Sequence, residues 1–138
     1  MADIRQVTDR FAVSPQISLE DLPQLAAQGF THVISNRPDG EATDQPTAAE
    51  VSSAAKAAGL TFVHAPFVGQ PTEEAVNAIV EAKGKTLAFC RSGTRSVTAW
   101  AIAAAITGVD VHDILHSAGH AGYNLSGLHD FLHQVAEG

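Results

Sequence analysis

Residues 86–107 restrict the fold of this chain more than any other segment. A short apolar run ends at Cys90, a polar turn containing Gly93 follows, and a long apolar helical stretch begins near Val97. A strand that turns directly into a helix at a cysteine places the sulfur over the backbone N–H groups of the helix N-terminus. Such N–H groups bind anions, and their field favours thiolate over thiol. The sequence therefore predicts a reactive thiolate at Cys90, the sole cysteine.

The loop after Cys90 carries the candidate anion-binding groups. They are Arg91, Ser92, Gly93, Thr94, Arg95 and Ser96. We expect Arg95 to be the catalytic partner of Cys90, because a guanidinium offers paired donors to an oxyanion or a persulfide. Arg91 is expected to point outward, toward substrate or simply into solvent, and Ser96 to cap the next helix or donate to the thiolate. An inert buried cysteine is the alternative, and the two arginines argue against it.

Length and composition limit the classes of protein to consider. A chain of 138 residues is long enough for one domain, which we expect to span residues 1–138. A formal net charge of −7 argues against a nucleic-acid partner. The N-terminus lacks a signal-peptide pattern, and no apolar stretch is long enough to span a bilayer. With a single cysteine as well, we expect a cytoplasmic protein without a membrane partner.

Apolar runs alternate with helical segments along the chain. The expected strands cover residues 4–8, 11–14, 31–35, 61–65 and 86–89, and the helices begin at Ser18, Thr47, Thr72, Val97 and Asp110, with a last one carrying Leu128, Phe131, Leu132 and Val135. This alternation predicts a three-layer α/β fold, with a largely parallel sheet of about five strands and helices on both faces. Because ligands bind beyond the carboxyl ends of such strands, loops 36–45, 66–71 and 90–95 should converge on one site.

Four further polar residues in these loops or at a strand end are candidates for the pocket. They are Arg37, Asp39, Glu41 and His64. Arg37 and Glu41 could pair with each other to brace their loop, or they could line the site. His64 could orient a group in the pocket, although a lone histidine is more often structural.

The histidines near the C-terminus raise the question of a metal. His112, His116 and His120 repeat at four-residue spacing, as do His129 and His133, and this spacing can bind zinc on one helix face. Without an intervening glutamate or a nearby cysteine, a solvated helical face is the default interpretation. We expect no metal site and no cofactor.

The spacing of the cysteine loop separates two chemistries. Protein tyrosine and dual-specificity phosphatases use Cys-x5-Arg. Rhodanese-type sulfurtransferases carry Cys-Arg-x-Gly-x-Arg/Thr, which residues 90–95 match position by position. A ring that is one residue smaller should suit the sulfane sulfur of a persulfide better than a tetrahedral phosphoryl group.

A phosphatase also needs a general acid to protonate the leaving oxygen. Residues 62–66 match the frame that precedes this acid in dual-specificity phosphatases, but no carboxylate follows before Glu73. Asp39 or Glu41 could supply one from the neighbouring loop. Outside the cysteine loop, the chain lacks the other rhodanese segments.

Nearly the whole chain resembles the phosphatase-like domain of bacterial beta-lactamase-hydrolase-like proteins. The resemblance rests on residues 13–17, 29–34, 36–41, 45–46, 59–60, 90–96 and 121–126. It implies a dual-specificity-phosphatase-like fold and a sulfur-transfer role in sulfide detoxification, although family members are commonly described as phosphatases or hydrolases. In some of them the domain is fused to a metallo-beta-lactamase-fold persulfide dioxygenase, which for this chain we expect to be a separate protein.

Three functions follow as hypotheses. In the first, Cys90 takes sulfur from a small anionic donor, such as thiosulfate or glutathione persulfide, and passes it to an external thiol, since the chain has no second cysteine. In the second, Cys90 is the nucleophile of a phosphomonoester hydrolase. In the third, the loop is a catalytically inactive module that binds anions or a protein partner.

Overall fold

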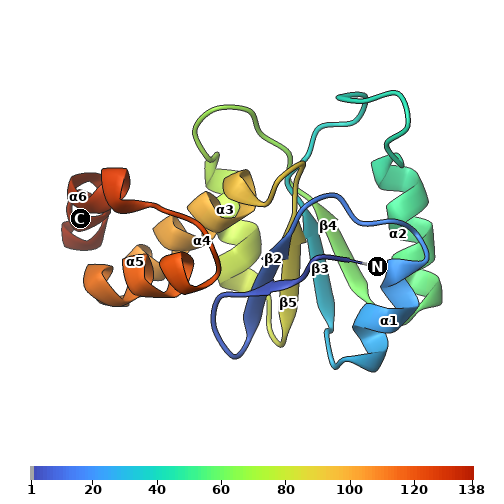
Figure 1. The fold of residues 1–138 in the computed structure, drawn as a ribbon, viewed down its shortest axis with the longest axis horizontal. Helices are drawn as coiled ribbons and strands as arrows, with labels where there is room; N and C mark the ends of the chain where they lie inside the picture. The colour runs from blue at the N-terminus through green and yellow to red at the C-terminus, as the bar shows by residue number, and fades with distance from the viewer. Residues whose placement is uncertain (1) are drawn as a thin grey trace.

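The strands form one five-stranded sheet in the order β1-β2-β5-β3-β4 (Figure 1). The structure is a computed structural model that describes residues 2–138. Its strands are β1 (Arg5–Gln6), β2 (Phe11–Ser14), β3 (His32–Ser35), β4 (Thr61–His64) and β5 (Thr86–Phe89). The short β1 pairs antiparallel with β2 across the expected hairpin, and the other neighbouring strands are parallel. The predicted largely parallel sheet is confirmed.

Helices cover both faces of this sheet, as the alternating pattern predicts. They are α1 (Asp21–Ala27), α2 (Ala48–Ala57), α3 (Glu73–Glu81), α4 (Thr94–Ile106), α5 (Val111–His120), the 3-10 helix η1 (Ser126–Leu128) and α6 (His129–Glu137). In Figure 1, α1 and α2 lie on one side of the sheet, and α3 to α6 lie on the other. Along β5, Leu87 and Phe89 pack with the first group, whereas Ala88 packs with the second.

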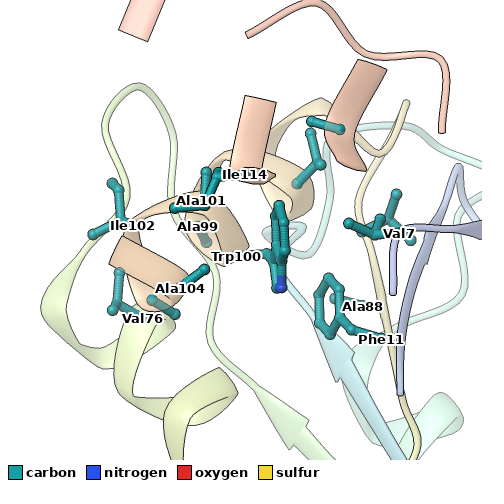
Figure 2. Packing of buried hydrophobic residues seen from close by; sticks show 14 of the residues in the cluster. Val7, Phe11, Val76, Ala88, Ala99, Trp100, Ala101, Ile102, Ala104 and Ile114 are labelled. Atoms are coloured by element: carbon teal, nitrogen blue, oxygen red, sulfur yellow. The ribbon is translucent and has the colours of Figure 1, made fainter. Parts of the chain in front are cut away.

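The core on the second face is built around α4. This alanine-rich helix is buried on most of its surface, which confirms the prediction from its composition. Trp100 stacks on Phe11 of β2, with ring centroids 6.1 Å apart. Figure 2 shows the indole lying over Phe11 beside Ala88. This packing fixes α4, and therefore its N-terminal turn, against the sheet.

Local capping signals place most helix starts correctly. The Thr47 hydroxyl and the Glu50 carboxylate form a reciprocal capping box at the start of α2. The side chains of Thr72 and Asp110 accept backbone hydrogen bonds at the starts of α3 and α5. In each case the capping side chain and the N–H group that it binds lie within four residues of each other, so the helix start can be predicted without knowledge of tertiary contacts.

Two expectations about the outer helices are wrong. The Asp21 carboxylate accepts the Ser18 N–H, which is one half of the expected capping box, but Ser18 does not cap α1, because the helix starts only at Asp21 and Glu20 occupies its N-cap position. In α6, Leu132 is fully buried, but Phe131 remains 43% exposed, so the helix docks through a narrower face than its spacing predicts. Within residues 2–138, no helix combines the length and the apolar character needed to cross a membrane.

The parallel strands end at one edge of the sheet. The loops that follow β3, β4 and β5 all leave this edge, the upper one in Figure 1. The segment after β2 joins them there, because Gln16 donates its backbone N–H to the Arg91 carbonyl (3.4 Å). The expected convergence of the polar loops is therefore present.

Candidate active site

Cys90 stands directly after β5, at the centre of this edge. Its sulfur accepts a hydrogen bond from the Gly93 N–H at 3.1 Å, and the residue is fully buried. The hydrogen bond to Glu41 is the largest cause that raises the pKa of Arg95, and electrostatic attraction and hydrogen bonding to the Cys90 side chain add to this rise. A backbone donor and a fixed positive charge both act on the sulfur, an arrangement that can stabilise a negative charge there.

Helix α4 begins earlier than expected, and this changes where two site residues lie. It starts at Thr94, directly after Gly93, rather than at Val97. Gly93 adopts φ +93°, in the left-handed region that favours glycine, and makes the sharp turn from strand to helix. Arg95 and Ser96 therefore lie in the first helical turn rather than in the loop.

Ser96 neither caps α4 nor donates to the sulfur, contrary to both expectations. Its hydroxyl donates to Asn36 Oδ1 at 2.8 Å, and Asn36 Nδ2 donates to the Ala65 carbonyl at 2.9 Å. Ser96 and Asn36 are completely buried, so this chain of hydrogen bonds ties α4 to the ends of β3 and β4. In the sequence, Asn36 stands out only as the first residue of a polar loop.

A carboxylate between two arginines is the main electrostatic feature of the rim. Glu41 accepts two hydrogen bonds from Arg95, Oε1 at 2.8 Å and Oε2 at 2.9 Å, and Arg37 Nε donates to Oε1 at 3.0 Å. Arg95 also donates to the Phe67 carbonyl at 3.1 Å, which ties the loop after β4 to the same group. The expected Arg37–Glu41 pair is present, and it extends to Arg95 through a contact that the sequence analysis did not anticipate.

The ion pair keeps Glu41 ionised. Hydrogen bonds from Arg95, the largest cause, and from Arg37 outweigh the effect of burial and lower the pKa of Glu41 to about 2. A carboxyl group with this pKa has no proton to donate near neutral pH. Glu41 therefore positions Arg95, and the expectation that it could act as a general acid does not fit the geometry.

The two other pocket candidates are occupied by structural contacts. Asp39 Oδ1 accepts the Ala48 N–H at 2.8 Å and thereby supports the first turn of α2. His64 Nε2 lies 2.9 Å from the Arg37 carbonyl oxygen and braces the loop after β3. Both side chains stabilise the site's frame, and no contact joins either one to the sulfur among the described residues.

The remaining loop residues lie at the surface. Arg91, Ser92 and Thr94 are exposed, and the Ser92 hydroxyl donates to Thr94 Oγ1 at 3.1 Å. The Ser92 carbonyl accepts a hydrogen bond from the Tyr123 hydroxyl at 3.0 Å. Sequence reasoning missed Tyr123 as a site residue. Its position within 121–126, a segment that carries the family resemblance, was the one available signal.

The histidines of α5 and α6 lie on exposed helix faces. His112, His116 and His120 are exposed on α5, and the rings of His129 and His133 contact each other on α6 with centroids 4.6 Å apart. Within residues 2–138, no group of three or more histidine, cysteine, aspartate or glutamate side chains is arranged to hold an ion. The solvated helical face remains the interpretation for these residues.

The Glu41 bridge predicts a specific pH dependence of stability. Because the pKa of Glu41 is lowered in the folded state, its contribution is complete above the unfolded value near 4.5 and is lost as the pH falls toward 2. We expect Glu41→Gln to lower the free energy of unfolding most at pH 5–7, with a smaller difference at pH 3. Urea unfolding across this range tests it, with Glu137→Gln at the exposed end of α6 as control. A difference independent of pH would contradict the bridge.

Comparison with known protein families assigns most of the chain to one domain. Residues 3–107 match the model of the beta-lactamase hydrolase-like protein, phosphatase-like domain. A beta-lactamase hydrolase-like protein from Agrobacterium fabrum is 35% identical over 108 residues, which are 75% of this chain. The chain spans only 25% of that relative's length, so the similarity concerns one part of a longer protein.

Solved structures resemble both the sequence and the fold. A Neisseria meningitidis protein, provisionally named a phosphatase, is 32% identical and has a TM-score of 0.79, covering 96% of this chain and 97% of its own. Kinase associated phosphatase, crystallised with its catalytic-site cysteine replaced by serine, has a TM-score of 0.71 over 99% of this chain and 94% of its own. Since that identity is 14%, this second likeness concerns the fold alone.

Proposed function

The chain belongs to the family of phosphatase-like domains found in beta-lactamase hydrolase-like proteins, and from this premise we propose that it is a sulfurtransferase that carries sulfane sulfur on Cys90. The backbone N–H groups of the loop and the Arg95 guanidinium would hold the resulting persulfide. Because Cys90 is fully buried, entry of a donor requires the surrounding loops to part.

The lack of an available general acid carries this proposal. Glu41 is held ionised by Arg95 and Arg37, Asp39 supports α2, and residues 65–72 contain no carboxylate. An alkoxide leaving from a phosphate ester needs a proton, which contributes about 10²–10⁴-fold to the rate. Sulfite and thiolates are stable anions, so they can leave without receiving a proton. The described site therefore suits donors with such leaving groups.

The proposed reaction has two steps. The Cys90 thiolate attacks the outer sulfur of thiosulfate, the S–S bond breaks, and sulfite leaves with the bonding electron pair. An external thiolate then attacks the terminal sulfur of the Cys90 persulfide, forms a new persulfide and releases the Cys90 thiolate. The acceptor thiol must lie outside these 138 residues, because they contain one cysteine. A persulfide dioxygenase is the proposed consumer of the product.

Phosphomonoester hydrolysis is the second candidate, and the comparisons favour it. The family model is phosphatase-like, and the Neisseria meningitidis relative carries a provisional phosphatase name. In this alternative, Cys90 attacks phosphorus, as the cysteine of a phosphatase does, and water releases phosphate from the enzyme. Without a free acid, we expect it to be restricted to esters whose leaving groups are already good, such as activated aryl phosphates.

The two functions can be distinguished by the group that becomes covalently attached to Cys90. After incubation with thiosulfate, we expect the intact mass of the protein to increase by one sulfur atom, and cyanide or glutathione to remove it. The Cys90→Ser variant is the blank, and aryl phosphate hydrolysis is measured in parallel. Cys90-dependent phosphate release without sulfur transfer would replace the proposal with the phosphatase. Absence of both activities would favour the third hypothesis, in which the loop is a catalytically inactive binding module.

Arg95 should contribute more to either reaction than an arginine outside the site. We expect Arg95→Met to lower kcat/KM about 10–100-fold, since a hydrogen bond to a charged group is worth about 1.5–3 kcal/mol. Arg10→Met removes an exposed arginine from the β1–β2 turn and serves as the control, with activity near that of the unmodified protein. Equal kcat/KM values in the two variants would show that Arg95 does not contact the reacting group.

A further inference from the structure

One peptide group in the cysteine loop is held at both ends. The Tyr123 hydroxyl donates to the carbonyl oxygen of Ser92 at 3.0 Å, and the N–H of Gly93 donates to the Cys90 sulfur at 3.1 Å. That carbonyl and that N–H belong to the same peptide unit. In a trans peptide the two groups point in opposite directions, so holding the oxygen fixes the direction of the N–H. The contact from Tyr123 therefore determines whether the N–H or the carbonyl oxygen of this peptide is directed at the sulfur.

This peptide needs such a contact because glycine follows it. Gly93 has φ +93°, and a glycine can adopt several other backbone conformations at little cost. Rotation of the Ser92–Gly93 peptide would turn its N–H away from Cys90 and its carbonyl oxygen toward the sulfur. A carbonyl dipole in that direction destabilises a thiolate or a persulfide anion, whereas the N–H stabilises it.

We propose that Tyr123 is a positioning residue, whose hydroxyl locks the Ser92–Gly93 peptide with its N–H directed at Cys90. It does not touch the reacting atoms itself. The contact joins residues 31 positions apart and reaches the loop from the segment between α5 and η1. The role in turnover rests on the proposed function, but the effect on the charge of Cys90 does not.

The surroundings of Tyr123 keep its hydroxyl in place and protonated. The side chain is almost completely buried, and the Arg5 guanidinium lies 5.4 Å from the ring centroid. Burial, the largest cause, raises the pKa of Tyr123 above its usual value and outweighs the opposing effect of the Arg5 guanidinium. Near neutral pH the hydroxyl therefore stays a donor, as the lock requires.

The test is the ionisation of Cys90 measured without any substrate. Because the chain has one cysteine, ¹³C labelling at the cysteine Cβ gives a single NMR resonance to titrate. We expect Tyr123→Phe to move the midpoint of the thiol-to-thiolate transition upward by about one pH unit, because one hydrogen bond to the charged form is lost. Persulfide formation at pH 7 should fall by up to about tenfold and recover as the pH rises. A merely structural role would not restore the rate at high pH.

A matched variant separates positioning from simple destabilisation. Leu132→Val shortens a fully buried side chain on α6, away from the loop, and is expected to leave the Cys90 midpoint unchanged despite a comparable loss of stability. An unchanged midpoint in Tyr123→Phe, or an equal shift in Leu132→Val, would overturn the proposal.

A second measurement remains available if Tyr123→Phe does not fold. Tyr123 is the sole tyrosine, so biosynthetic incorporation of 3-fluorotyrosine changes this one hydroxyl. The fluorinated phenol is a stronger hydrogen-bond donor, and the Cys90 midpoint should move downward. No downward movement overturns the proposal. Either midpoint shift in a protein that transfers no sulfur would overturn the proposed function and leave the positioning role of Tyr123 in place.

Discussion

Cys90→Ser should abolish every turnover of this protein while leaving its fold intact. Persulfide formation cannot occur on serine, and any hydrolysis should fall by at least about 10³-fold, because an alcohol is hardly ionised at neutral pH and is a far weaker nucleophile than a thiolate. The serine hydroxyl can still accept the Gly93 N–H that Cys90 accepts at 3.1 Å, so the loop keeps its main internal contact.

Three measurements check this result. They are the intact mass after thiosulfate treatment, the rate of sulfur transfer to cyanide, and the release of phosphate from an aryl ester. The thermal midpoint is the control, and we expect the variant to lose no more than about 2 kcal/mol of stability, the cost of an imperfectly satisfied buried hydroxyl. Transfer that persists in a folded Cys90→Ser protein would show that the sulfur is not the nucleophile.

Gly93→Ala should be the most destabilising single change in the cysteine loop. The backbone at this position has φ +93°, which costs an L side chain about 1–2 kcal/mol. The new methyl group would also overlap the Tyr123 hydroxyl and lie 3.0 Å from its Cζ atom, and overpacking of this kind costs about 1–3 kcal/mol. We expect a total loss of about 2–5 kcal/mol, a thermal midpoint lower by about 10 °C, and loss of the oriented N–H at Cys90.

Gly108→Ala is the matched control for this change. Gly108 has nearly the same conformation, φ +95°, but nothing lies within 4 Å of the position its methyl group would take. The stability lost in Gly108→Ala should therefore be the conformational cost alone. Combining Gly93→Ala with Tyr123→Phe removes the overlapping hydroxyl and should recover part of the lost stability. Equal losses at the two glycines, or no recovery in the double variant, would contradict the close approach of Tyr123 to the loop.

The leaving group connects the two candidate chemistries of this site. Both begin with the Cys90 thiolate and a small anion held by backbone N–H groups and a guanidinium, and they differ in whether the departing atom needs a proton. Glu41 is the main candidate for a general acid in this site, but its two arginine partners keep it ionised. In the proposed function, this ion pair disfavours a reaction whose leaving group needs a proton.

Much of the fold could be predicted because the signals are local. β5 has the predicted limits, Thr86–Phe89, and Thr47 caps α2 as its spacing with Glu50 indicates. Period-two and period-3.6 patterns, together with capping residues, act over a few positions of the chain. One helix start was predicted wrongly because no side chain caps that helix. The start of α4 moved to Thr94 because Gly93 alone makes the turn, with no side chain capping the helix.

The candidate site could be predicted only in outline. Parallel strands bring their carboxyl ends to one edge, so the convergence of the loops followed from topology alone. The hydrogen-bond partners of the side chains at that edge did not follow from topology. Ser96 donates to Asn36, 60 positions away, and Arg95 binds Glu41, 54 positions away. Hydrogen bonds of this kind depend on the distances between packed loops, which leave no periodic trace in the sequence.

By itself, the sequence determined the order of the strands and helices along the chain, the edge at which chemistry is expected, and the single thiol available for it. These depend on hydrophobic periodicity, turn residues and the number of cysteines, which are properties of neighbouring positions or of composition. Only the tertiary structure decided that Glu41 is bound to Arg95 and that Tyr123 holds the peptide facing Cys90. Both contacts exist because packing brings distant segments within hydrogen-bond distance.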